Sequence, residues 1–123
     1  MRLLLDTHVA IWWLSGDRRL TAATRLSIED ASDAFLSVVS VWEILIKQGS
    51  GRLDLPDGFV DALRDDFVEL PLTFDHALEG RTLPFLHRDP FDRMLVAQAK
   101  AEGLTIVTSD RILSEYGVPV LVA

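Results

Sequence analysis

Residues 89–110, DPFDRMLVAQAKAEGLTIVTSD, predict a helix that passes directly into a strand. Asp89 is a favoured N-cap residue, Pro90 suits the first helical position, and Gly103 suits the end of the helix. The run from Leu104 to Thr108 is apolar without alternation, which is typical of a strand covered on both faces. This segment therefore predicts one unit of a parallel α/β sheet.

The rest of the chain shows the same alternation of short strands and helices. We expect further strands at 2–5, 34–39, 68–72 and 119–122, and helices at 8–14, 21–30, 41–48, from 56 onward, 75–83 and 112–116. Pro119 suits an edge strand, because a proline has no N–H to donate to a second neighbour. The predicted fold class is an α/β sandwich with a mostly parallel sheet between layers of helices.

Length and composition limit the class of protein. The chain has 123 residues, 49% of them hydrophobic, which matches one domain over residues 1–123 with enough apolar material for a core. It contains no cysteine, so disulfides and cysteine-ligated zinc or iron–sulfur sites are excluded. No apolar run reaches the ~18 residues of a membrane span, and the first residues do not form a secretory signal. We therefore expect a cytoplasmic protein with no membrane contact.

The net charge is −7, from 19 acidic and 12 basic residues. Because phosphate groups are neutralised by clustered Lys and Arg, this balance argues against nonspecific binding of nucleic acid. Net charge does not say where the acidic side chains lie, so this conclusion depends on their positions in the fold.

Four acidic residues stand where predicted strands end or where predicted helices begin: Asp6, Glu43, Asp92 and Asp110. Ligands of open parallel sheets bind beyond the carboxyl ends of the strands, so these four side chains are candidates to converge. Each also has a simpler interpretation as part of a helix cap. Residues 40–43, SVWE, match the S-x-x-E capping box, and caps are far commoner than catalytic acids.

The joint pattern favours a metal site, because all four acids adjoin strongly apolar sequence and would lie near the rim of one core. Converging carboxylates repel one another and have raised pKa values, which a divalent cation neutralises. Oxygen ligands without cysteine favour Mg²⁺, with Mn²⁺ as the alternative, over Zn²⁺. Such a site suits hydrolysis of a phosphodiester. Arg88, Arg93 and Arg111 are candidates to hold the phosphate, although an Arg beside an Asp is usually a solvated surface pair.

Four segments of the chain resemble the motifs of the PIN-domain family, in particular the VapC-type toxins of toxin–antitoxin pairs. They are LLLDTHVAIWWL at 3–14, SVVSVWEI at 37–44, HRDPFDRMLVAQA at 87–99 and TIVTSDRIL at 105–113. The resemblance implies a PIN-like three-layer sandwich with about five strands. Asp6, Glu43, Asp92 and Asp110 match the four family acids, while Asp89 belongs to a longer motif and is also explained by its capping role.

The resemblance further implies a Mg²⁺-dependent endoribonuclease toxin. Asp6 and Asp110 would bind the metal most directly, with Asp92 and Glu43 completing the site, and metal-activated water would leave a 5′-phosphate and a 3′-hydroxyl. Thr7 and Ser109 are candidates to orient these carboxylates. A packed or site-rim role is expected for His8, because other family members often carry Asn there.

The implied partners are an RNA substrate, a cognate VapB-like antitoxin and a second copy of the chain in a homodimer. The apolar run from Ile11 to Leu14 supports a partner weakly, because it is too wide to face only one core. One of Trp12 and Trp13 is a candidate for an interface, while core packing is expected for at least one of them. Trp42, Phe85 and Phe91 are expected in the core instead. 

Two other classes of α/β protein fit the sequence less well. A receiver domain needs paired early acids and a lysine after a late strand, but the two lysines, Lys47 and Lys100, fall in predicted helices. A haloacid-dehalogenase-like phosphatase needs D-x-D, and Asp6 is followed by Thr7 and His8. A catalytically inactive PIN fold that serves as a binding scaffold stays open as the alternative function.

Overall fold

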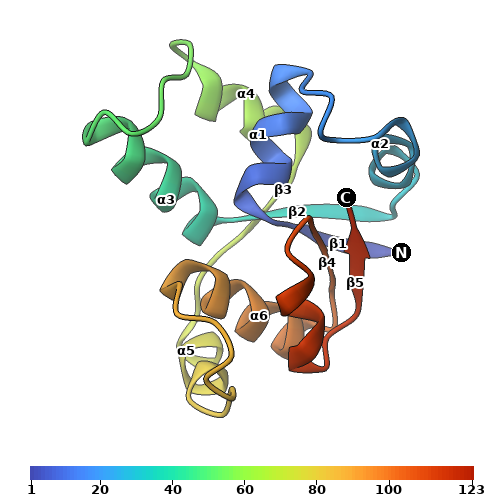
Figure 1. The fold of residues 1–123 in the computed structure, drawn as a ribbon, viewed down its shortest axis with the longest axis vertical. Coiled ribbons are helices and arrows are strands. Elements are labelled where there is room, and N and C mark those ends of the chain that lie inside the picture. Colours follow the sequence, from blue (N-terminus) through green and yellow to red (C-terminus); the bar gives the residue numbers. More distant parts are fainter.

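A five-stranded sheet forms the centre of the computed structural model, which describes residues 1–123 (Figure 1). Every strand pair is parallel, and the order is β3-β2-β1-β4-β5. The strands are β1 (Arg2–Leu5), β2 (Asp33–Ser37), β3 (Val68–Leu70), β4 (Thr105–Thr108) and β5 (Val120–Val122). The predicted α/β class is confirmed, and the strand that Pro119 leads lies at the sheet edge.

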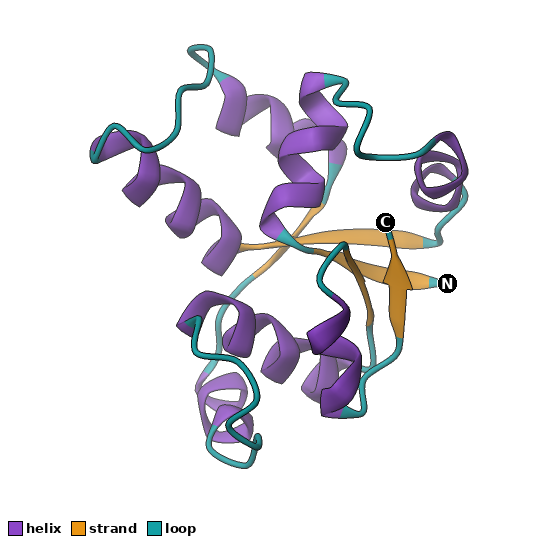
Figure 2. Ribbon diagram, in the orientation of Figure 1, coloured by secondary structure: helices purple, strands orange, loops and turns teal.

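Helices cover both faces of the sheet, as Figure 2 shows, so the molecule has three layers. The helices are α1 (Thr7–Ser15), α2 (Ala22–Glu29), α3 (Val38–Gly49), α4 (Phe59–Asp66), α5 (Phe74–Gly80), α6 (Pro90–Glu102) and the 3₁₀ helix η1 (Arg111–Tyr116). Helices α1 to α4 lie on one side, and α5, α6 and η1 lie on the other (Figure 1). No helix combines the length and apolar character needed to cross a bilayer.

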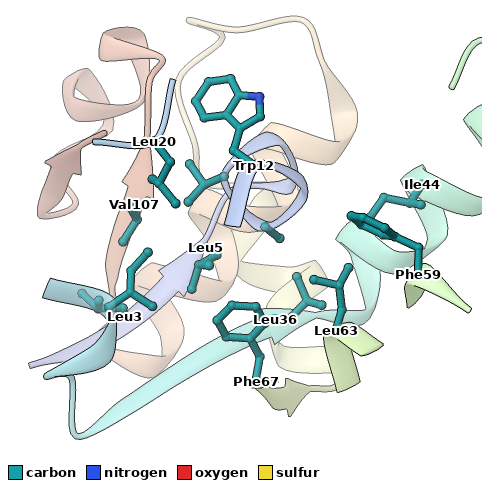
Figure 3. Packing of buried hydrophobic residues seen from close by; sticks show 13 residues of the cluster. Leu3, Leu5, Trp12, Leu20, Leu36, Ile44, Phe59, Leu63, Phe67 and Val107 are labelled. Atoms are coloured by element: carbon teal, nitrogen blue, oxygen red, sulfur yellow. The ribbon is translucent and has the colours of Figure 1, made fainter. Parts of the chain in front are cut away.

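The alternation of β1 side chains divides the core into two clusters. Leu3 and Leu5 pack with α1, α3 and α4, whereas Leu4 packs with α6 and η1, because successive side chains of a strand point to opposite faces. Figure 3 shows the first cluster, in which Trp12 and Phe67 belong to the same core as the strand residues Leu3 and Leu5. Burying one Leu side chain stabilises the fold by about 2 kcal/mol, so this central strand is firmly anchored.

Some element boundaries differ from those predicted, for identifiable reasons. β2 ends at Ser37, two residues before the predicted end, because the Ser37 hydroxyl accepts the Val39 N–H at 3.0 Å and caps α3. α4 begins at Phe59, after Gly58 adopts a φ of 78° that other residues rarely take. β3 stops before Pro71, which has no N–H for the ladder.

The expectations for the aromatic residues are partly wrong. Trp12 is buried, which confirms the expectation that at least one of the pair packs in the core, and the Trp13 indole N–H donates to Asp66 Oδ2 at 3.1 Å. Trp42 and Phe85 do not lie in the core as the sequence predicts: they are 60% and 78% exposed. Trp42 lies on the exposed side of α3. The sequence does not indicate this, because the residues around Trp42 are apolar as well.

Candidate metal centre

Four carboxylates meet at the carboxyl ends of β1 and β4. Asp6 follows β1, Asp110 follows β4 by two residues, Glu43 lies in the second turn of α3, and Asp92 lies in the first turn of α6. Burial first, and then the negative charges of Asp6, Asp89 and Glu43, raise the pKa of Asp92 to about 7 against an ordinary value of 3.8. This coupling shows that acids far apart in sequence lie close together in space.

Asp6 is a buried site residue and not a helix cap. It occupies the N-cap position of α1, but its side chain makes no capping hydrogen bond. Its Oδ2 instead accepts the Thr108 hydroxyl at 2.7 Å, which joins the ends of β1 and β4. Burial raises the pKa of Asp6, and the Thr108 bond and the nearby His8 oppose that rise. His8 itself is exposed at the rim of the site, as expected.

Glu43 is held between two helices. Its Oε1 accepts the Thr7 hydroxyl at 2.7 Å, and its Oε2 pairs with Lys47 Nζ at 2.8 Å, one turn later on α3. The capping-box interpretation of 40–43 is wrong, because α3 already begins at Val38 and Ser37 supplies the cap. The role predicted for Thr7 in orienting a carboxylate is supported by this bond.

Asp89 and Asp110 act as caps, but only Asp110 also faces the site through a side-chain contact. Asp89 Oδ1 accepts the N–H groups of Phe91 and Asp92 at 2.8 and 3.4 Å. Asp110 Oδ1 accepts the Ile112 N–H at 3.0 Å, while Oδ2 lies 2.9 Å from His87 Nε2. Capping and site geometry are therefore compatible at Asp110.

His87 is the residue that sequence reasoning missed. Its Nε2 lies 2.9 Å from Asp110 Oδ2 and 3.3 Å from Asp92 Oδ2. One ligand atom from each of these three residues lies within 4.8 Å of the others, while Asp6 and Glu43 are outside this compact group. The signal in the sequence was the position of His87, two residues before the N-cap of a helix whose first turn carries a site acid.

Two other supporting residues differ from those expected. Ser109 is exposed, and Thr108, one position earlier, holds the carboxylate, because the side chain of the last strand residue points into the layer that contains Asp6. Arg93 does not face the acids: its guanidinium donates to the Pro84 carbonyl at 2.8 Å and lies over the Phe85 ring. Arg88 lines a cavity of about 420 Å³ beside Glu43.

The donor set fits a hard divalent cation. Carboxylates from four elements gather with one paired lysine, Lys47, among them. The pKa of Asp92 is raised to about 7, first by burial and then by the neighbouring carboxylates. Oxygen-rich sites of this kind bind Mg²⁺ or Mn²⁺ in preference to softer metals. A bound cation would lower the pKa of Asp92 and stabilise the ionised cluster.

Comparison with known proteins identifies the family. The family model described as PIN domain matches residues 3–119. The chain belongs to the PIN-domain family. This PIN-domain chain is 31% identical over 121 residues to the protein named Ribonuclease VapC22 from Mycobacterium tuberculosis, across 95% of this chain and 93% of that one.

Solved structures share the PIN fold. VapBC2 from Rickettsia felis, bound to a DNA fragment from its promoter, has a chain with a TM-score of 0.77 at 13% identity, covering 98% of both chains. FitAcB from Neisseria gonorrhoeae has a TM-score of 0.69 at 20% identity, covering 97% of this chain and 96% of that one. At these identities the likeness shows the fold, and it confirms the predicted PIN-like three-layer sandwich.

Proposed function

We propose that this PIN-domain protein is a metal-dependent endoribonuclease toxin of the VapC type, which a cognate antitoxin neutralises. The observation that carries the proposal is the position of Asp92: burial and the charges of Asp6, Asp89 and Glu43 raise its pKa to about 7, and His87 lies between its carboxylate and that of Asp110. The similarity to a protein named as a ribonuclease, across nearly the whole chain, supports the same reaction class.

The proposed cofactor is Mg²⁺, with Mn²⁺ as the alternative, held by Asp6, Glu43, Asp92 and Asp110. When bound, such an ion supplies Lewis-acid stabilisation of phosphodiester charge and makes water a better nucleophile at neutral pH. The chain's own residues fix the carboxylates before binding: Thr108 holds Asp6, and Thr7 with Lys47 holds Glu43. Preorganised ligands lose little conformational entropy when a cation arrives.

The cavity beside Glu43 gives the RNA backbone a place to bind despite the net charge of −7. Lys47, Arg52 and Arg88 line it, and Arg88 is exposed without an ion-pair partner. Cations beside the acids would attract phosphate groups toward the site, while the acidic remainder of the surface disfavours binding elsewhere. We therefore propose that one segment of the RNA substrate binds across this cavity, between α3 and the start of α6.

We also propose a VapB-like antitoxin partner, a homodimer and a single domain over residues 1–123. The solved relatives include toxin–antitoxin assemblies, and Trp42 with Leu45 gives α3 an exposed apolar surface beside the site. An RNA substrate and the lack of cysteine suit action in the cytoplasm.

A growth assay separates the nuclease from a binding scaffold. Induction of the wild-type chain in cells should arrest growth, whereas the Asp6→Asn variant, expressed to the same level, should be harmless. Asp61→Asn, in exposed sequence on α4, is the matched control and should arrest growth like the wild type. Growth arrest by Asp6→Asn at equal expression would favour the scaffold.

A further inference from the structure

His87 is held at three points beside the carboxylates of the candidate metal centre. Its backbone N–H donates to the Tyr116 hydroxyl at 2.8 Å, so the loop before α6 is tied to η1. Its ring contacts the Asp89 N–H at Nδ1 and Asp110 Oδ2 at Nε2. The ring is only 21% exposed, so few rotations are open to it.

The hydrogen bond at Nδ1 assigns the position of the ring proton. The Asp89 N–H lies 3.1 Å from Nδ1 and is a donor only, so Nδ1 must accept. A ring nitrogen that accepts carries no proton, which leaves the proton of the neutral imidazole on Nε2. The Asp89 N–H is itself part of the start of α6, so this assignment is built into the helix N-terminus.

A protonated Nε2 has no lone pair to offer a cation. It acts as a donor to Asp110 Oδ2 at 2.9 Å, and Asp92 Oδ2 lies 3.3 Å from the same nitrogen. For His87 to bind a metal through Nε2, the proton would have to move to Nδ1, and the bond from Asp89 would be lost. The compact grouping of His87, Asp92 and Asp110 is therefore better explained by hydrogen bonding than by ligation.

We infer that His87 is a positioning residue, which fixes the carboxylate of Asp110 by donating to one of its oxygens and sets its separation from Asp92. The Ile112 N–H holds the other Asp110 oxygen at 3.0 Å, so the carboxylate plane is fixed from both sides. This inference rests on the proposed function only in taking Asp92 and Asp110 as metal ligands. Removal of a side chain that orients a metal ligand commonly lowers metal affinity 10- to 100-fold.

The tautomer is tested directly by ¹⁵N NMR of histidine-labelled protein. The chain has three histidines, and the spectrum of His87→Gln assigns the His87 signals by their disappearance. We expect the proton on Nε2 in the metal-free protein and in the presence of Mg²⁺. A proton on Nδ1 in either state would overturn the inference.

Metal titration tests the positioning role. His87→Gln keeps an N–H donor, whereas His87→Leu has none, and circular dichroism with thermal melting checks that both fold. We expect Mn²⁺ affinity, measured by calorimetry, to fall about 10- to 100-fold in His87→Leu and at most about threefold in His87→Gln. Equal affinity of His87→Leu and wild type, or equal losses in both folded variants, would overturn the role.

Pulsed electron paramagnetic resonance of bound Mn²⁺ distinguishes positioning from ligation. We expect no directly coordinated histidine nitrogen in the wild type, and such a nitrogen signal, lost in His87→Gln, would show that His87 is a ligand. None of these measurements uses RNA cleavage. A wild-type protein that binds no divalent cation would contradict the proposed function, while the tautomer measurement would still decide the state of His87.

Discussion

The Thr108 hydroxyl donates to Asp6 Oδ2 at 2.7 Å and accepts the Asp110 N–H at 3.0 Å. One side chain at the end of β4 therefore positions two acids that are more than a hundred residues apart. The hydroxyl is fully buried, so no water replaces it when it is removed. The geometry of the candidate metal centre depends on this contact between two adjacent parallel strands.

Replacing Thr108 with Val should destabilise the fold and raise the pKa of Asp6 further. The Thr108 bond lowers that pKa, so its loss leaves the buried carboxylate less solvated. We expect the free energy of unfolding at pH 8 to fall by about 1–3 kcal/mol, as for other buried groups that lose a partner. Urea denaturation in EDTA measures this change. Thr108→Ser, which keeps the hydroxyl, is the control; equal stability of the two variants would contradict the role of the bond.

Asp92→Asn should stabilise the metal-free protein above neutral pH. The pKa of Asp92 is about 7 in the fold and near 3.8 when unfolded, so ionisation is more costly in the fold. Below pH 4 the carboxyl is neutral in both states, so it costs the wild type no stability relative to the Asn variant. As the pH rises from about 4 to about 7, the wild type loses stability relative to that variant. After allowance for partial exposure, we expect the free energy of unfolding of Asp92→Asn at pH 8 to exceed that of the wild type by about 1–3 kcal/mol.

Urea denaturation at pH 5 and pH 8 in EDTA measures the effect of Asp92→Asn, with Asp61→Asn on α4 as the matched control. The gain should be larger at pH 8 than at pH 5, and Mg²⁺ should favour the wild type because the Asn variant loses a ligand. An Asn variant that is less stable than the wild type at pH 8 without metal would show that Asp92 is not held in a repulsive cluster.

Arg88→Gln should weaken RNA binding without changing metal affinity. Arg88 lines the cavity beside Glu43 but contacts none of the four acids through an ion pair. Loss of one phosphate contact should weaken RNA binding about 3- to 10-fold and reduce the slope of log affinity against log salt by about one. Fluorescence anisotropy measures the RNA affinity and its salt dependence, in an Asp6→Asn background that is expected not to cleave the RNA. Arg18→Gln, an exposed residue after α1, is the control, and equal effects of the two would contradict a specific path for the RNA.

The fold and the places of the four acids at the ends of strands and the starts of helices were predictable because they depend on local patterns. Apolar strands followed by acids define the ends of β1 and β4, and the parallel sheet brings those ends together. Details that depend on contacts between elements were not predictable. The choice of Thr108 over Ser109 depends on which side of β4 faces Asp6, and the role of His87 depends on how the loop before α6 packs on Tyr116.

The apolar sequence around Trp42 misled prediction for a related reason. SVVSVWEILI is apolar on most sides of α3, so the sequence does not show which side is covered. In the structure Glu43 and Ile44 face inward, while Trp42 and Leu45 face outward. Trp42 therefore lies on the exposed side of the helix that carries Glu43.

The most direct test of the central claim is the mapping of RNA product ends after cleavage by purified wild-type and Asp6→Asn protein. We predict cleavage that requires Mg²⁺ or Mn²⁺, stops in EDTA, leaves 5′-phosphate and 3′-hydroxyl ends, and falls at least about 100-fold in Asp6→Asn. Products with 2′,3′-cyclic phosphate, or full activity of Asp6→Asn, would contradict the account.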